Sequence, residues 1–364
     1  MKQSNNTKKI FGGQSSRDSN FEFFRIILMI AIVAHHYVVN SGFSSLYDFD
    51  NITGNMIFLQ LFGFAGKIGI NCFVFITGYF MVKSQFKFEK LVKLYLEIKF
   101  YKLIIYAIFL LTGHETFSLG GFIKTVFNIA YGVEAGFTGT FVFLYVLIPI
   151  INAMLLHLNK KLHLTLIGIL IFLYTFISTF MLHDTYSNLG WMITTYIIAA
   201  YVRLYPCKWF ENKRLYIWGT ICSVFLSWLS ILVVDFIGVK VGFRSYYHMV
   251  ANEHKFLALV CSFSLFMLFK NIKIKQNKFI NTVAASTFGV LLIHANSDAM
   301  RQFLWRDLLK NTSYYDSPYL VVHAIVSVLA VYVVCVCIDQ CRIHLLEKPL
   351  FDYIGRRKAK DKRK

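Results

Sequence analysis

The chain has 364 residues, of which 57% are hydrophobic and 16% are charged, and its formal net charge is +19. An average soluble protein carries about 25% charged residues, so this composition excludes an ordinary soluble protein. Long apolar runs recur along nearly the whole length. The sequence therefore predicts one all-α domain that crosses a membrane many times, without a separate soluble domain.

We expect about ten transmembrane helices. A tail at 1–20 precedes the transmembrane domain at 21–341, and a basic tail follows at 342–364. The expected spans lie near residues 18–40, 67–82, 93–112, 138–156, 163–182, 190–205, 215–237, 255–270, 282–304 and 318–341. A shorter apolar piece at 56–65 is followed by two close glycines and is expected to be interfacial or re-entrant.

The basic residues predict the orientation of these spans. If both termini are cytoplasmic, the inner segments hold 29 lysines and arginines and the outer segments hold eight. This distribution follows the positive-inside rule and places both tails in the cytoplasm. Because topology and anionic lipid at the inner leaflet account for most of the net charge, we expect membrane lipids as partners and no nucleic acid.

The first span, from Asp18 to Asn40, contains unusual polar residues for a membrane helix. Arg25 lies near its start and the pair His35-His36 near its end, in an otherwise apolar run. Ionisable groups inside a bilayer are costly and indicate function. Eleven residues separate Arg25 from His36, which is about 16 Å of helix rise and a return to within about 20° of the same face. His35 points about 80° away, so His36 is the better candidate.

Two interpretations of Arg25 and His36 stay open. Arg25 could extend to the inner headgroups and pair with Glu22, or its guanidinium could hold a phosphate or a pantetheine-linked group. His36 could be an interfacial histidine like its neighbour Tyr37, or a general base that takes a proton from a hydroxyl. Because Arg25 and His36 share a face, the functional interpretation is favoured.

The second span adds hydroxyl groups inside an aromatic-rich helix. Thr77 and Tyr79 flank Gly78, a small residue that fits either close helix packing or the lining of a site. We expect Thr77 and Tyr79 to contribute to substrate binding.

The seven cysteines fall mainly within expected helices and show neither CxxC nor the Cys/His spacing of a metal site. We therefore expect the chain to hold no metal.

The ninth expected span ends in a polar sequence. His294 and Asp298 are four residues apart and share a face of a continuous helix, where they could pair. Asp298 could instead form an ion pair with Arg301, three residues further on. His294 and the nearby Asn296 are therefore candidate substrate-binding residues.

These motifs resemble those of the acyltransferase-3 family of bacterial integral-membrane proteins. The stretch Asp18-Ser-Asn-Phe-Glu-Phe-Phe-Arg25 with His35-His36-Tyr37 is similar to the family's opening, which has an arginine, ten residues and a histidine. Phe73-Val-Phe-Ile-Thr-Gly-Tyr79 resembles its second-span motif. Thr287-Phe-Gly-Val-Leu-Leu-Ile-His294 with Trp305 is similar to the late span of its surface-polysaccharide branch. The resemblance covers nearly the whole chain.

The resemblance implies a multi-pass enzyme of the bacterial plasma membrane that O-acylates, usually O-acetylates, extracytoplasmic sugars. It implies that His36 is essential to transfer and that Arg25 handles the donor, cytoplasmic acetyl-CoA or another acyl-CoA, with no permanently bound cofactor. Many members carry Arg-x-x-Arg after the second span, where this chain has Lys90 and Lys93. Lysines keep the charge but lose the bidentate fork of a guanidinium.

The residue chemistry is compatible with this activity. Arg25, Lys90 and Lys93 would hold the donor phosphates at the inner face, and His36 would deprotonate a hydroxyl arriving from outside. That hydroxyl would belong to a cell-surface polysaccharide or to its lipid-linked precursor. A transporter or flippase of a lipid-linked glycan or small anion is the alternative from another class, with the same residues as substrate or proton groups. A membrane interaction or sensor protein is a third class.

Overall fold

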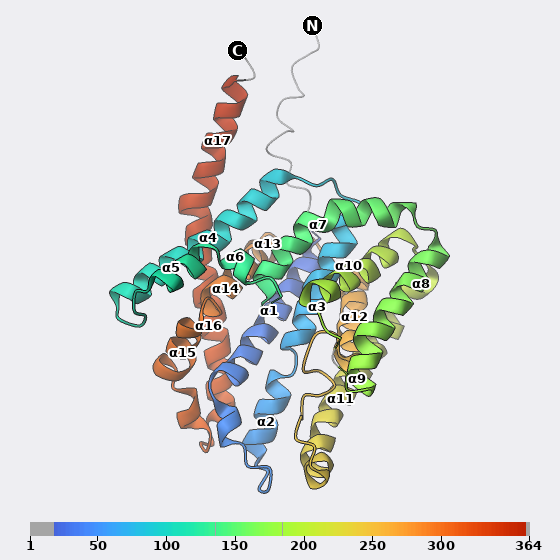
Figure 1. Ribbon diagram of the computed structural model, residues 1–364, viewed down its shortest axis with the longest axis vertical. Helices are drawn as coiled ribbons and strands as arrows, with labels where there is room; N and C mark the ends of the chain where they lie inside the picture. The colour runs from blue at the N-terminus through green and yellow to red at the C-terminus, as the bar shows by residue number, and fades with distance from the viewer. Residues whose placement is uncertain (1–17, 135, 184, 362–364) are drawn as a thin grey trace.

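The computed structural model describes residues 18–134, 136–183 and 185–361, and all regular secondary structure in them is helical (Figure 1). The predicted all-α class is thereby confirmed. The long helices are α1 (Ser19–Asn40), α3 (Gly66–Met81), α4 (Phe88–Leu111), α7 (Phe137–His157), α10 (Asn188–Leu204), α11 (Lys213–Val233), α12 (Phe256–Asn271) and α16 (Leu320–Arg342). The shorter helices are α2 (Gly54–Gly63), α5 (Leu119–Val126), α6 (Asn128–Tyr131), α8 (Lys160–Ile171), α9 (Ser178–Phe180), α13 (Lys278–Ala285), α14 (Thr287–His294), α15 (Asp298–Gln302) and α17 (Lys348–Asp361).

Six helical segments of the described chain are long and apolar enough to cross a membrane: Ser19–Asn40, Gly54–Met81, Phe137–His157, Lys160–Phe180, Lys213–Gly238 and Leu320–Arg356. A seventh is counted if a bent pair, Lys278–His294 and Asp298–Tyr314, forms one span. The remaining expected spans are also helices. However, α10 has 17 residues, α12 has 16, and α4 contains six lysines and glutamates. The number of ten therefore stays a prediction.

The sequence predicted the segment at 56–65 to be a separate interfacial or re-entrant piece, and the structure differs. Helices α2 and α3 together form one candidate span. Phe64 and Ala65, which join them, keep right-handed helical backbone angles, and the amide of Gly69 bonds to the carbonyl oxygen of Ala65 at 2.9 Å. Because the right-handed backbone runs on through this junction, the two helices are counted as one span.

The late span expected near 282–304 is broken. Helices α14 and α15 belong to two segments that meet at an angle of 97°. Ser297 begins α15 as its N-cap and accepts a hydrogen bond from the amide of Met300 at 3.1 Å. The break leaves His294 as the last residue of α14, inside the bundle.

Helix α1 lies at the centre of the molecule, with α2, α3, α12, α13, α14 and α16 packed against it. Its first half joins one buried cluster through Phe21, Phe24 and Leu28, and its second half joins another from Met29 onward. The ring of Phe24 stacks on Phe269 of α12 with centroids 4.2 Å apart. Helix α1 therefore connects the part of the bundle built on α3, α10 and α12 to the part built on α4, α14 and α16.

The two ends of the described chain lie toward the same end of the molecule. Helix α1 begins beside α13, where Ser19 donates to the side chain of Asn281 at 3.0 Å, and α17 extends from the bundle at this end (Figure 1). This arrangement agrees with tails on one side of a membrane. Which side they occupy stays a prediction.

Gly78 allows close helix packing in the second span, which is the first of the two interpretations given for it. A Cβ atom at Gly78 would lie 2.7 Å from the backbone oxygen of Tyr196 and 3.0 Å from the Cβ of Ala199, both on α10. Backbone cannot move aside as a flexible side chain can. Gly78 therefore allows α3 and α10 to approach one another.

The substitution Gly78→Ala is expected to destabilise the protein by about 1–3 kcal/mol, because it overpacks the contact between α3 and α10. The matched control is Gly168→Ala in α8, where an added Cβ meets no atom within 4 Å. Thermal unfolding of the two variants in the same detergent measures the difference. Equal midpoints for both variants would contradict the close packing of α3 on α10.

Candidate functional site

His36 and His294 meet where the second half of α1 packs on α14. The Nδ1 atom of His36 lies 2.9 Å from Nε2 of His294, which is hydrogen-bonding distance. His294 is fully buried, whereas His36 is half-buried and keeps some exposed surface. The two residues are 258 positions apart in the sequence. The structure thus brings together two candidate site residues that were predicted from different spans of the sequence.

The hydrogen bonds around this pair indicate which ring nitrogens carry a proton. Nδ1 of His294 lies 2.6 Å from the carbonyl oxygen of Val290, and since a carbonyl can only accept, this nitrogen donates. In a neutral ring, Nε2 of His294 is then unprotonated and accepts the hydrogen on Nδ1 of His36. The remaining nitrogen of His36, Nε2, is left without a proton. His36 therefore presents a basic nitrogen held in one tautomer.

His35 has a structural position, in agreement with the predicted preference for His36. Its Nδ1 donates to the carbonyl oxygen of Gly63 at 2.6 Å. Its ring lies against Gly66, where an added Cβ would come within 2.2 Å of the imidazole Cγ. His35 thus joins α1 to the junction between α2 and α3.

Two cations lie near the histidine pair. Arg301 of α15 and Lys67 of α3 are close enough for their charges to act on His36. Each also has a carboxylate partner, because Arg301 contacts Asp298 at 2.7 Å and Lys67 contacts Glu253 at 3.1 Å. The charges beside the histidine pair therefore belong to two ion pairs and are not two lone cations.

Asp298 pairs with Arg301 and not with His294. The pairing of His294 with Asp298 requires a continuous helix, in which residues four apart share a face. The chain bends between α14 and α15, so Asp298 begins a new helix with a different direction. The structure therefore shows the second of the two alternatives for Asp298.

Asn296, a predicted substrate-binding residue, lies in this bend and is 6% exposed. Its side-chain amide donates to the carbonyl oxygen of Leu292 at 2.9 Å, and its backbone carbonyl oxygen accepts from Nζ of Lys102 on α4. Lys102 was not among the predicted site residues. Its only signal in the sequence is a charge just before the apolar run of α4. Lys102 therefore joins the neighbourhood of His294.

Arg25 lies at the other end of α1 from the histidine pair. Its Nη1 donates to Oε1 of Glu22 at 3.0 Å, and its side chain is 32% exposed. The pairing with Glu22 is thereby confirmed. Since the carboxylate faces only one side of the guanidinium, Arg25 retains donors for a further anion, and its role in donor handling stays a prediction.

Tyr79 is engaged by an arginine that the sequence did not single out. Arg203, in the last turn of α10, donates to the hydroxyl of Tyr79 at 3.0 Å and lies over its ring at 4.7 Å. Its buried Nε makes no hydrogen bond to any described residue. Thr77 uses its hydroxyl on its own helix, donating to the carbonyl oxygen of Phe73 at 2.9 Å. Arg203 thus adds a cation at the end of the bundle where Arg25 lies.

The two lysines at the place of the Arg-x-x-Arg pair differ in their surroundings. Lys90 is exposed in the first turn of α4, whereas Lys93 contacts Glu347 at 2.6 Å. Glu347 also accepts from Arg342, whose guanidinium contacts two further carboxylates, Glu97 at 3.1 Å and Asp339 at 2.8 Å. Lys93 therefore belongs to an ion cluster that ties α4 to α16. Binding of donor phosphates by both lysines stays a prediction.

The cysteines show no sign of a metal centre in the part of the chain that the structure describes. All seven are free thiols, and no three His, Cys, Asp or Glu side chains between residues 18 and 361, outside 135 and 184, lie together as metal ligands would. That the chain holds no metal stays a prediction.

Comparison with known proteins identifies the family. A family model described as an acyltransferase domain matches residues 18–339, from the start of α1 almost to the end of α16. No curated protein and no solved structure matches the chain. Because the matched region covers nearly the whole chain, the protein belongs to the acyltransferase-3 family and is a multi-pass membrane acyltransferase.

Proposed function

We propose that this acyltransferase is an O-acyltransferase of a bacterial plasma membrane and, more specifically, an O-acetyltransferase. Its donor would be cytoplasmic acyl-CoA, and its acceptor a hydroxyl of an extracytoplasmic cell-surface polysaccharide or of the lipid-linked precursor. One observation supports O-acyl transfer above all others. The hydrogen bond from His36 to His294 leaves Nε2 of His36 as an unprotonated, partly accessible base.

His36 would act as the general base. Nε2 takes the proton of the acceptor hydroxyl while its oxygen attacks the carbonyl carbon of the thioester. The carbon–oxygen bond forms, the carbon–sulfur bond breaks, and the CoA thiolate leaves with the proton from the imidazolium. No oxidant or metal enters this balance.

His294 would be a positioning residue. Its Nε2 accepts from Nδ1 of His36 in both protonation states of His36, so the ring keeps its orientation while it gains and loses a proton. The carbonyl oxygen of Val290 fixes the tautomer of His294 in turn. An orienting group behind a catalytic histidine has the same function in many hydrolases.

The donor would bind at the end of the molecule where α1 begins. Arg25, Arg203 and Lys90 are cations there, and the phosphates of acyl-CoA are polyanions. We single out Arg203, because its guanidinium contacts a neutral group, the hydroxyl and ring of Tyr79, whereas Arg25 contacts the carboxylate of Glu22. Helix α1 then runs from the donor end to His36, about 16 Å further along.

The substitution His36→Ala is expected to lower acyl transfer by at least about a hundredfold, the usual contribution of a general base. The assay is transfer of label from acetyl-CoA to surface glycan in membrane preparations, with mass spectrometry of glycan from deletion and complemented strains to identify the acceptor. His157→Ala is the control, because His157 is exposed and bonds only to its own helix. A parental rate in His36→Ala would refute the assignment. Substrate movement across liposomes by wild type without acyl transfer would favour a transporter.

Two substitutions at His294 are expected to distinguish its role in orienting the ring of His36 from the packing of its own ring. His294→Phe keeps a ring but removes the acceptor for Nδ1 of His36, and should lower kcat about tenfold to a hundredfold with little change in KM for acyl-CoA. His294→Gln retains an acceptor oxygen and should recover part of this loss. The pH dependence of kcat is the second readout, since the acid limb should move in the phenylalanine variant. Equal losses in both variants would indicate a packing role only.

Arg203→Ala is expected to raise KM for acyl-CoA about tenfold, the effect of one lost charge-assisted hydrogen bond. Arg203→Lys should give an intermediate value, because lysine keeps the charge and loses the fork. Arg214→Ala, an exposed arginine at the start of α11, is the matched control. Steady-state kinetics with varied donor concentration measure the effect. A fall in kcat at constant KM would argue against donor binding by Arg203.

A further inference from the structure

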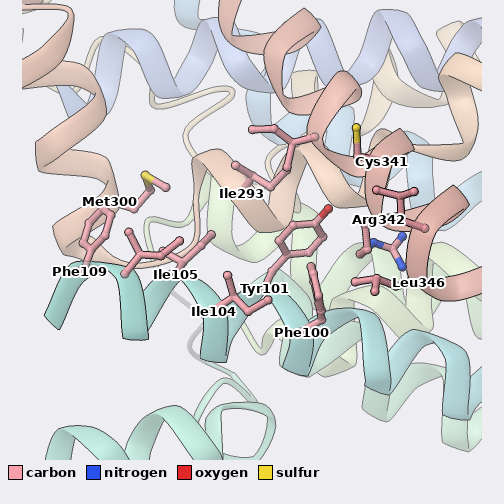
Figure 2. Close-up of a pocket in the computed structure, with 13 residues that line it drawn as sticks. Phe100, Tyr101, Ile104, Ile105, Phe109, Ile293, Met300, Cys341, Arg342 and Leu346 are labelled. Carbon is pink, nitrogen blue, oxygen red and sulfur yellow. The ribbon is translucent and has the colours of Figure 1, made fainter. Parts of the chain in front are cut away.

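An apolar groove runs along the bundle between α4, α14 and the end of α16 (Figure 2). Its volume is about 460 Å³, within the range of about 300–1,000 Å³ for cavities that hold small molecules. Ile105, Phe109 and Ile293 form its buried floor. Ile104 and Ile108 are 41% and 49% exposed, so the groove is open along the side of α4. For a transmembrane bundle, this open side faces lipid.

The lining of the groove favours a hydrocarbon occupant. Its two strongly polar side chains are Tyr101 and Arg342, and both already bond to the carboxylate of Asp339 at 2.8 Å. A pantetheine arm contains amides, which would lose their hydrogen bonds to water without finding partners in this groove. A chain of methylene or isoprene units has no such cost.

The charges at the two ends of the groove differ. At one end the positive charges of Arg342 and Lys93 are already taken up by three carboxylates, so no cation is left for an added anion; the carboxylates are Glu97, Asp339 and Glu347. At the other end the lining residues Ile293 and Met300 directly precede His294 and Arg301 in the chain.

Two cations gather at the end of the groove near His294. Arg301 is 38% exposed, and its charge acts on Lys102 of α4. Lys102 donates to the carbonyl oxygen of Asn296, a neutral group. Asp298, the partner of Arg301, is almost fully exposed, so water screens that ion pair. A phosphate at this end would meet both cations.

We infer that the groove binds the hydrocarbon chain of a single-chain lipid phosphate, with the phosphate at Arg301 and Lys102. The lipid is the carrier of the acyl acceptor, and its headgroup sugar is thereby brought to His36. This inference rests on the proposed function and narrows it, because it selects the lipid-linked acceptor over a free polysaccharide. The single groove accounts for one chain, and the charge difference between its ends accounts for the orientation.

The test is binding of decaprenyl phosphate to the full chain in nanodiscs, followed by native mass spectrometry. Ile104→Trp and Ile108→Trp fill the groove from its lipid side and are expected to weaken binding at least tenfold. Leu229→Trp is the matched control, because Leu229 is also 41% exposed but lies on α11, which packs on α12 and α2. Lys102→Gln should weaken binding of decaprenyl phosphate more than binding of decaprenol.

The possible outcomes separate this inference from the proposed function. Equal binding of decaprenol, decaprenyl phosphate and phosphatidylglycerol would mean that bulk lipid fills the groove and would overturn the inference. A rise in KM for acyl-CoA in the tryptophan variants, without loss of lipid binding, would overturn it in favour of the donor. If wild type acylates a soluble oligosaccharide while the tryptophan variants bind lipid normally, only the inference fails. If lipid binding changes as expected but wild type transfers no acyl group, only the proposed function fails.

Discussion

The hydrogen bond between His36 and His294 is the contact on which the chemistry of this site depends. It forms because α14 ends at His294, where the chain bends into α15, and because α1 passes through the centre of the bundle beside that end. The carbonyl oxygen of Val290 then fixes the proton on His294, and His294 fixes the proton on His36. A base of defined tautomer is thus produced by two histidines and one backbone group.

The ion cluster around Arg342 has a complementary role at the other end of α4. Three carboxylates and Lys93 surround this guanidinium, so a charge that would be costly to bury alone is compensated. The cluster holds α4 against the end of α16. Further along α4 the two helices are separated by the apolar groove, and Lys102 reaches Asn296 beside the histidine pair. One helix therefore connects the ion cluster, the groove and the surroundings of the histidine pair.

Much of the site could be predicted where it depends on one helix. The spacing of Arg25 and His36 is a property of helical geometry, and the pairing of Arg25 with Glu22 is a contact within one turn. The size of Gly78 left packing and site lining both open, and the contact with α10 shows that it packs. Predictions that assumed a continuous helix were less successful, because His294 and Asp298 are separated by a bend whose cap, Ser297, is a common polar residue. Arg203 was missed because a cation in the last turn of a helix is ordinary in sequence.

The sequence by itself determined the helical class, the membrane character and the candidate base, since these follow from hydrophobicity, charge and helical periodicity over short distances. Only the tertiary structure decided which nitrogen of His36 is basic, that Lys93 pairs with Glu347, and that Lys102 approaches Asn296. Each of these contacts joins residues far apart in the chain. The physical reason is that a charge or a hydrogen-bonding group in the sequence has no partner until packing supplies one, and packing depends on all the helices at once.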